Sequence, residues 1–141
     1  MKQQRTIVLP SGLLWFALYG GVAFAEFTTW SQVAEEIAAH INLAEALYQE
    51  GKPTEAGHEV VQAYFGVFED RKMEAAMRIE LGAKHTYQVE QQFGALRKAI
   101  RGNAEGGTVK VLAQDIRTSV TRDAQALDQA KIPMQVFETN P

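Results

Sequence analysis

The chain has 141 residues, of which 46% are hydrophobic and 22% charged, with a formal net charge of −3 and no cysteine. This length suits a single domain with its own hydrophobic core and is short for two. The acidic balance argues against nucleic acid as a partner, because a phosphate backbone requires a basic surface. The lack of cysteine excludes disulfides, thiolate metal sites, iron–sulfur clusters and covalently attached c-type haem. Any metal would therefore be held by carboxylate, imidazole or thioether groups.

The first 25 residues have the pattern of a secretory signal peptide. Lys2 and Arg5 precede the apolar stretch "IVLPSGLLWFALYGGV", and the small residues of "AFA" lead to Glu26. We therefore expect residues 1–25 to be cleaved and the mature protein to be periplasmic. An uncleaved membrane anchor is the alternative, but the stretch is short for a span and is interrupted by Pro10 and by glycines. Without Lys2 and Arg5 the chain keeps 12 basic and 17 acidic residues, a net charge of −5.

Residues 26–130 are predicted to form an all-α domain, because apolar residues recur at helical spacing and no stretch alternates strictly between apolar and polar. The first helix is expected to start at Thr29, which has the spacing of a capping box with Gln32. It should end where Gly51 and Pro53 interrupt the chain. Its buried stripe is predicted to consist of Trp30, Val33, Ile37, Ile41, Ala44 and Tyr48.

A second helical region is expected from about Thr54, with Val61, Phe65 and Phe68 on its buried side. The region continues or restarts as far as Gly82, with a kink at the "EDRK" segment. It therefore comprises one bent helix or two consecutive helices.

A third helix is predicted over residues 83–100, and the glycine-rich segment "RGNAEGG" after it is predicted to be a loop. A fourth helix follows, with Thr108 as its N-cap. Four amphipathic helices with short connections predict an antiparallel four-helix bundle with up-down connections. Residues 131–141 contain two prolines and no helical period, so we expect a linker or a C-terminal tail.

Two pairs of possible metal ligands have helical spacing. Glu55 and His58 form a Glu-x-x-His motif, and Glu36 and His40 are four residues apart on one helical face. Helical bundles build di-iron sites from such motifs, but a ferritin-like centre needs two Glu-x-x-His motifs and two further glutamates. A solvent-exposed surface position without a metal is the alternative for each of the four residues.

Two further glutamates are expected at the edges of apolar helical faces. Glu69 directly follows Phe68, and Glu90 occupies the same kind of position in the third helix. A carboxylate at such an edge must be hydrated, hydrogen-bonded or bound to a cation. On neighbouring antiparallel helices the two could converge on one hard cation, with His85 or Tyr64 nearby. The alternative is an ion pair with a basic residue, namely Arg71, Lys72 or Arg97.

Met73 and Met77 are four residues apart on one helical face. This spacing would suit a copper site with thioether ligands, and filling of the hydrophobic core is the alternative. The sequence contains no nucleophile motif and no phosphate loop, so we expect no enzymatic activity. A haem-binding bundle that uses a histidine and a methionine is a further hypothesis.

Two segments of the chain carry a resemblance to a family of membrane transporters. "AYFGVFE" at 63–69 and "VEQQFGALRKAI" at 89–100 resemble the extracytoplasmic N-terminal domain of bacterial members of the oxidase-dependent, high-affinity iron permease family. "W-x-x-V-A-x-x-I" and "A-x-x-x-Y-x-x-G" of the first helix agree too, so the resemblance extends from Trp30 through the fourth helix. The family's Arg-Glu-x-x-Glu transport motif is absent, so the chain itself is not expected to be the pore.

The resemblance implies a periplasmic module of an iron-uptake system that presents iron to a membrane permease, alongside periplasmic iron- or copper-binding partners. Glu69 and Glu90 lie inside the matching segments, so we expect them to bind iron, with help from His85, Glu36 and His40. A metal-free interaction module that docks a periplasmic partner or positions the permease is the alternative. The protein is expected to be either free in the periplasm or tethered to the inner membrane through a following permease domain.

Overall fold

The computed structural model describes residues 26–137, so the predicted signal peptide and the last four residues of the tail lie outside the described residues. The elements are α1 (Trp30–Gln49), α2 (Pro53–Val61), the π-helix η1 (Gln62–Glu69), α3 (Met73–Glu80), α4 (Ala83–Arg101), α5 (Gly106–Gln129) and the 3₁₀-helix η2 (Met134–Phe137). No strand occurs between residues 26 and 137, which confirms the all-α class. None of the helices in this range has the length and hydropathy needed to cross a membrane.

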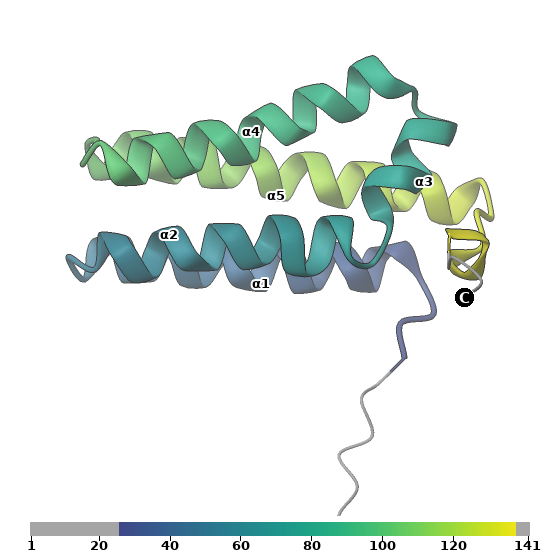
Figure 1. The fold of residues 1–141 in the computed structure, drawn as a ribbon, viewed down its shortest axis with the longest axis horizontal. Helices are drawn as coiled ribbons and strands as arrows, with labels where there is room; N and C mark the ends of the chain where they lie inside the picture. The colour runs from purple at the N-terminus through teal and green to yellow at the C-terminus, as the bar shows by residue number, and fades with distance from the viewer. Residues whose placement is uncertain (1–25, 138–141) are drawn as a thin grey trace, which may run out of the picture.

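The long helices lie side by side, and α3 is set across one end of them (Figure 1). α2 passes into η1 without a break, and the two form one rod that packs against α1. α1 and α4 each pack against α5, and α4 also contacts α2. α3 contacts η1, α4 and α5 and so joins the two halves of the domain at that end.

The start of α1 is held by a local capping box and by residues from the C-terminal part of the domain. Thr29 and Gln32 form the predicted capping box, which is confirmed. In addition, the Asp128 carboxylate of α5 accepts hydrogen bonds from the backbone N–H groups of Trp30 at 2.8 Å and Ser31 at 3.0 Å. The Trp30 indole donates to the Ile132 carbonyl at 2.7 Å, so the beginning of the predicted tail is held against the domain.

The predicted kink in the second helical region is a complete break. η1 ends at Glu69, and Lys72 adopts the left-handed conformation with φ 63° before α3 begins. A second positive φ, 91° at Gly82, separates α3 from α4. Because both breaks redirect the chain, α3 lies across the end of the long helices, where it reaches both η1 and α4.

The buried stripe of α1 is as predicted except for Tyr48, which is half-buried and donates its hydroxyl to the Ala104 carbonyl. The prediction for α2 and η1 was partly wrong. Phe68 is buried, but Phe65 is 53% exposed and Val61 is only half-buried. The rod instead packs through small or β-branched side chains, namely Ala56, Val60, Ala63 and Val67. Small side chains allow close approach to α1, and this close packing decides which face is buried.

The predicted N-cap at Thr108 was also wrong. α5 begins three residues earlier than a cap at Thr108 implies, at Gly106, and its N-cap is Glu105, whose side chain makes no capping hydrogen bond. The Thr108 and Val109 N–H groups donate to the Glu105 carbonyl, so the helix has already started there. The first two helical residues are glycines, so no side-chain capping pattern in the sequence indicated this start.

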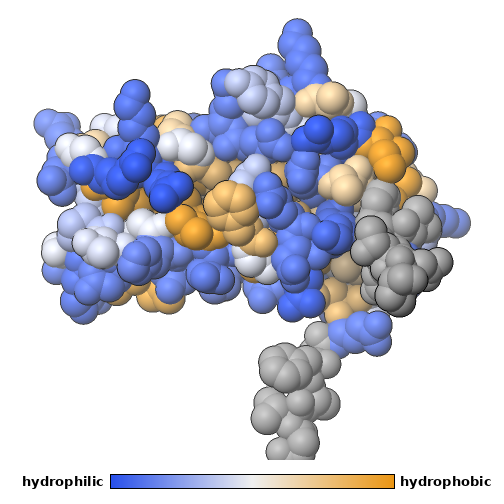
Figure 2. Space-filling view, viewed as in Figure 1, coloured by the Kyte–Doolittle hydropathy of each residue, from blue (hydrophilic) through white to orange (hydrophobic). Residues whose placement is uncertain are grey.

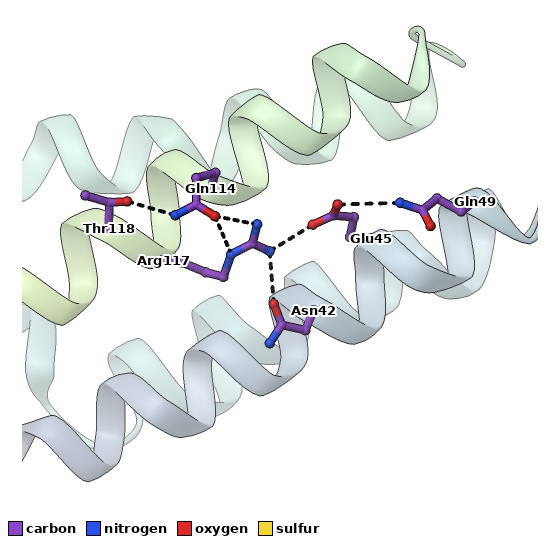
Figure 3. Close-up of polar contacts among 6 residues, drawn as sticks. All are labelled: Asn42, Glu45, Gln49, Gln114, Arg117 and Thr118. Carbon is purple, nitrogen blue, oxygen red and sulfur yellow. Dashed lines mark hydrogen bonds and ion pairs between the residues drawn. The ribbon is translucent and has the colours of Figure 1, made fainter.

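A polar seam joins α1 and α5 along their exposed edge (Figure 3). Arg117 of α5 donates to Glu45 at 2.9 Å and to Asn42 at 3.0 Å, both on α1. Gln114 accepts from the same guanidinium at 2.9 Å and 3.2 Å and holds it in place. The Arg117 and Glu45 side chains are only 18% and 16% exposed, which limits screening of the pair by solvent.

Candidate functional site

The π-helix brings Tyr64 and Glu69 to one side of η1. Residues five apart point in different directions on an α-helix, but the i→i+5 bonding of a π-helix places them nearly above one another. The Tyr64 phenol accordingly lies close to the Glu69 carboxylate. Burial, followed by the proximity of Glu69 and the negative charges of Glu90 and Glu74, raises the pKa of Tyr64 well above its usual range. The phenol therefore remains protonated and is available as a hydrogen-bond donor.

Glu74 of α3 and Glu90 of α4 meet beside this tyrosine. Arg78 donates to both carboxylates, and its distance to Glu90 is 3.1 Å. Burial and the neighbouring charge of Glu74 raise the pKa of Glu90, and Arg78 offsets the effect only in part.

We call Tyr64, Glu69, Glu74, Arg78 and Glu90 the acidic cluster. The wall beneath it is aromatic, since the Tyr64 ring lies 5.8 Å from Phe68 and 5.4 Å from Phe93, centroid to centroid. The Glu74 and Glu90 side chains are 23% and 19% exposed, so the carboxylates are neither fully hydrated nor sealed in the core.

Chemically, the acidic cluster is a weak attractor for a cation. It contains three carboxylates and one guanidinium, which pairs with Glu74 and Glu90, so ionisation of all three carboxylates leaves an excess of two negative charges. Carboxylate oxygens are the ligands preferred by hard cations. Within residues 26–137, however, no three His, Asp or Glu side chains are already arranged around a point that could hold a metal ion. A bound cation would have to displace Arg78 and draw the carboxylates together.

The other predicted ligands lie in separate pairs. His85 Nε2 is 2.8 Å from the buried Asp123 carboxylate, and no hydrogen bond or ion pair among the described residues joins it to Glu69 or Glu90. His40 Nδ1 is 2.7 Å from Glu59 on α2. Glu36 lies 3.9 Å from Arg71, and one of its carboxylate oxygens is buried without a hydrogen bond to any residue between 26 and 137.

The residues expected to be weaker ligands are also dispersed. Glu55 and His58 are exposed near the start of α2, and His58 lines a groove that Glu55 does not reach. Met73 and Met77 share one face of α3, as predicted, and both are completely buried in the core. Two thioethers closed off in this way fill space between helices.

Sequence reasoning missed the partner of Glu90. The predicted partners were Arg71, Lys72 and Arg97, but the guanidinium that reaches Glu90 belongs to Arg78. Arg78 is four residues after Glu74, a spacing that signals a pair on one helical face. The spacing in the sequence therefore indicated the Glu74–Arg78 pair. The contact of Arg78 with Glu90 depends on the turn at Gly82, which the spacing does not show.

Fold and site together define an all-α protein with a half-buried acidic cluster where η1, α3 and α4 meet. Comparison with models of known protein families, with curated proteins and with solved structures finds no match. The site must therefore be interpreted from its own chemistry and from the sequence resemblance.

Proposed function

We propose that this protein is a periplasmic helical module of an iron-uptake system, which binds iron weakly and presents it to a membrane permease. The observation that carries the proposal is the convergence of Glu69, Glu74 and Glu90 beside Tyr64, where Arg78 pairs with Glu74 and Glu90. The resemblance to the iron permease family supports it, because Glu69 and Glu90 belong to the two segments that carry that resemblance.

We also propose an antiparallel four-helix bundle with up-down connections for this module, in which α3 is a short insertion. The four members are α1, the α2–η1 rod, α4 and α5. Contacts of α1 with α2 and α5, and of α4 with the same two elements, support this arrangement because they close a ring of four helices.

Iron binding at the acidic cluster is weak in this proposal for two reasons. Arg78 must leave Glu74 and Glu90, and burial together with the charge of Glu74 raises the pKa of Glu90 and so disfavours the ionised carboxylate that a metal requires. Metal binding that releases a proton becomes tighter as the pH rises. A weak site suits a donor, since the ion must be passed on to the permease or taken from a periplasmic iron- or copper-binding partner.

Calorimetric titration of the full chain with ferrous iron under anoxia tests the proposal, with copper and manganese as comparison metals. We expect saturable iron binding that is lost in the Glu69→Gln, Glu90→Gln double variant. The matched control is Glu35→Gln, Glu80→Gln, which removes the same charge from two exposed positions outside the acidic cluster. Unchanged binding in the first double variant, or equal loss in the control, would refute the site.

The exposed aromatic surface favours a second candidate, a metal-free module that docks a periplasmic partner or positions the permease. Phe65 is 53% exposed and lines a groove of about 150 Å³ with Val61, Phe93 and Gly94. Figure 2 shows an apolar patch on the face where α2 and α4 lie side by side, surrounded by hydrophilic residues. Co-purification of the permease that survives metal stripping but is lost in Phe65→Glu would favour this candidate over iron binding.

A further inference from the structure

A second groove lies along the contact between α2 and α4, next to the first groove, with which it shares Val61 and Arg97. It has a volume of about 360 Å³ and is lined by the start of α2, the end of α4 and Asn103 of the following turn. Its charged groups are Arg97 and Arg101, with His58 on the α2 side as a further basic group, and no acidic residue among positions 26–137 lines it. A basic groove is unexpected on a chain in which acidic residues outnumber basic ones by 17 to 14.

The two arginines differ from every other arginine in the described part of the chain. Arg71, Arg78, Arg117 and Arg122 each form an ion pair with a carboxylate. Across residues 26–137, neither Arg97 nor Arg101 has a hydrogen bond or an ion pair. They are four residues apart on α4, so their side chains project from the same face into one groove.

The remaining lining groups suit an anion as well. The Thr54 hydroxyl and the Asn103 amide line the groove without a hydrogen-bond partner among the described residues, so both are available as donors. Gly57 lies between Thr54 and His58 in the same wall, and its missing side chain leaves the helix backbone accessible. The helix dipole favours a basic residue such as Arg101 in the last turn of α4, but Arg97 lies outside that turn.

We propose that this groove binds a small multivalent oxyanion, one that carries carboxylate or phosphate groups, between the Arg97 and Arg101 guanidinium groups and the start of α2. Guanidinium groups present paired N–H donors whose geometry matches the two oxygens of a carboxylate or phosphate. A volume of about 360 Å³ is at the small end of ligand sites, which fits a compact anion. This inference does not rest on the proposed iron site, which uses other residues.

The test is isothermal titration of the full chain at low ionic strength with two probes, sodium citrate and inorganic phosphate. We expect saturable binding of at least one probe, weakened on raising the salt concentration. Each arginine contributes about tenfold or more in affinity, the usual effect of a charge-assisted hydrogen bond. The Arg97→Gln, Arg101→Gln double variant should therefore bind at least about 100-fold more weakly, which in practice removes the signal.

Two further measurements test whether the anion binds in this groove. Lys98→Gln, Lys110→Gln removes the same charge from exposed positions that do not line the groove, and it should leave binding nearly unchanged. Amide chemical shifts of Thr54 and Gly57 should move with the bound fraction of the anion. Absence of saturable binding for both probes, equal loss in the lysine control, or shifts confined to other regions would each overturn the proposal. Glu69→Gln, Glu90→Gln should retain anion binding, so failure of the iron proposal and of this one can be distinguished.

Discussion

Asp128 of α5 caps the first turn of α1 from a distance of almost 100 residues along the chain. Its carboxylate accepts three hydrogen bonds, from the N–H groups of Trp30 at 2.8 Å and Ser31 at 3.0 Å and from the Ser31 hydroxyl at 2.6 Å. A negative charge at this position also interacts favourably with the positive end of the α1 dipole. Substitution of Asp128 by alanine therefore removes a tertiary contact and a helix cap together.

The magnitude follows from these contacts. A hydrogen bond to a charged group contributes about 1.5–3 kcal/mol, and loss of an N-cap costs about 1 kcal/mol. The three bonds share one carboxylate, and water replaces part of them at this half-buried position, so their contributions do not add. We expect Asp128→Ala to lower the free energy of unfolding by about 2–4 kcal/mol, which corresponds to a Tm lower by about 10 °C. Asp128→Asn keeps one acceptor oxygen and should lose about half as much.

Urea unfolding followed by far-UV circular dichroism measures the effect. Asp115→Ala is the matched control, because Asp115 is an exposed aspartate of the same helix and makes no hydrogen bond or ion pair among the described residues. A loss below about 1 kcal/mol for Asp128→Ala, or a loss no greater than in the control, would show that the cap is unimportant to stability.

Three further predictions concern the site and its supports. Phe68→Ala removes a fully buried ring from beneath Tyr64 and should lower the free energy of unfolding by about 3–5 kcal/mol in urea unfolding; a loss under 1 kcal/mol would contradict its place in the core. Lys72→Gly should raise that free energy by about 0.5–1 kcal/mol, because φ 63° is unfavourable for lysine, and a lower midpoint would argue against this reasoning. Burial and Glu74 raise the pKa of Glu90, so its ionisation is disfavoured in the folded state. The folded protein therefore loses stability as the pH rises through and above the usual pKa range of a glutamate. Glu90→Gln lacks this loss, so its stability relative to the unsubstituted protein should increase between pH 4 and pH 7, and an equal difference at the two pH values would contradict the raised pKa.

Several features of the fold could be predicted because they depend on residues close together in the chain. The capping box of Thr29 and Gln32 uses residues three apart, and the stripe from Trp30 to Ala44 follows from the helical period alone. The third helix was predicted over 83–100 and is observed as Ala83–Arg101, because Gly82 and Gly102 limit it at both ends. Local backbone preference and periodicity are sufficient for such features.

By itself, then, the sequence determined the all-α class, the helices with clear local signals, and the position of Glu69 and Glu90 at the edges of apolar faces. The tertiary structure decided which groups meet. The π-helical stretch of η1 brings Tyr64 to Glu69, and the turn between α3 and α4 brings Glu74 and Arg78 to Glu90. The tertiary structure likewise pairs His85 with Asp123, 38 residues away, and gives Arg97 and Arg101 no hydrogen-bond or ion-pair partner among the described residues. The physical reason is that side-chain pairing depends on distances in space. The spacing of residues along one helix does not determine the angle at which the next helix packs against it.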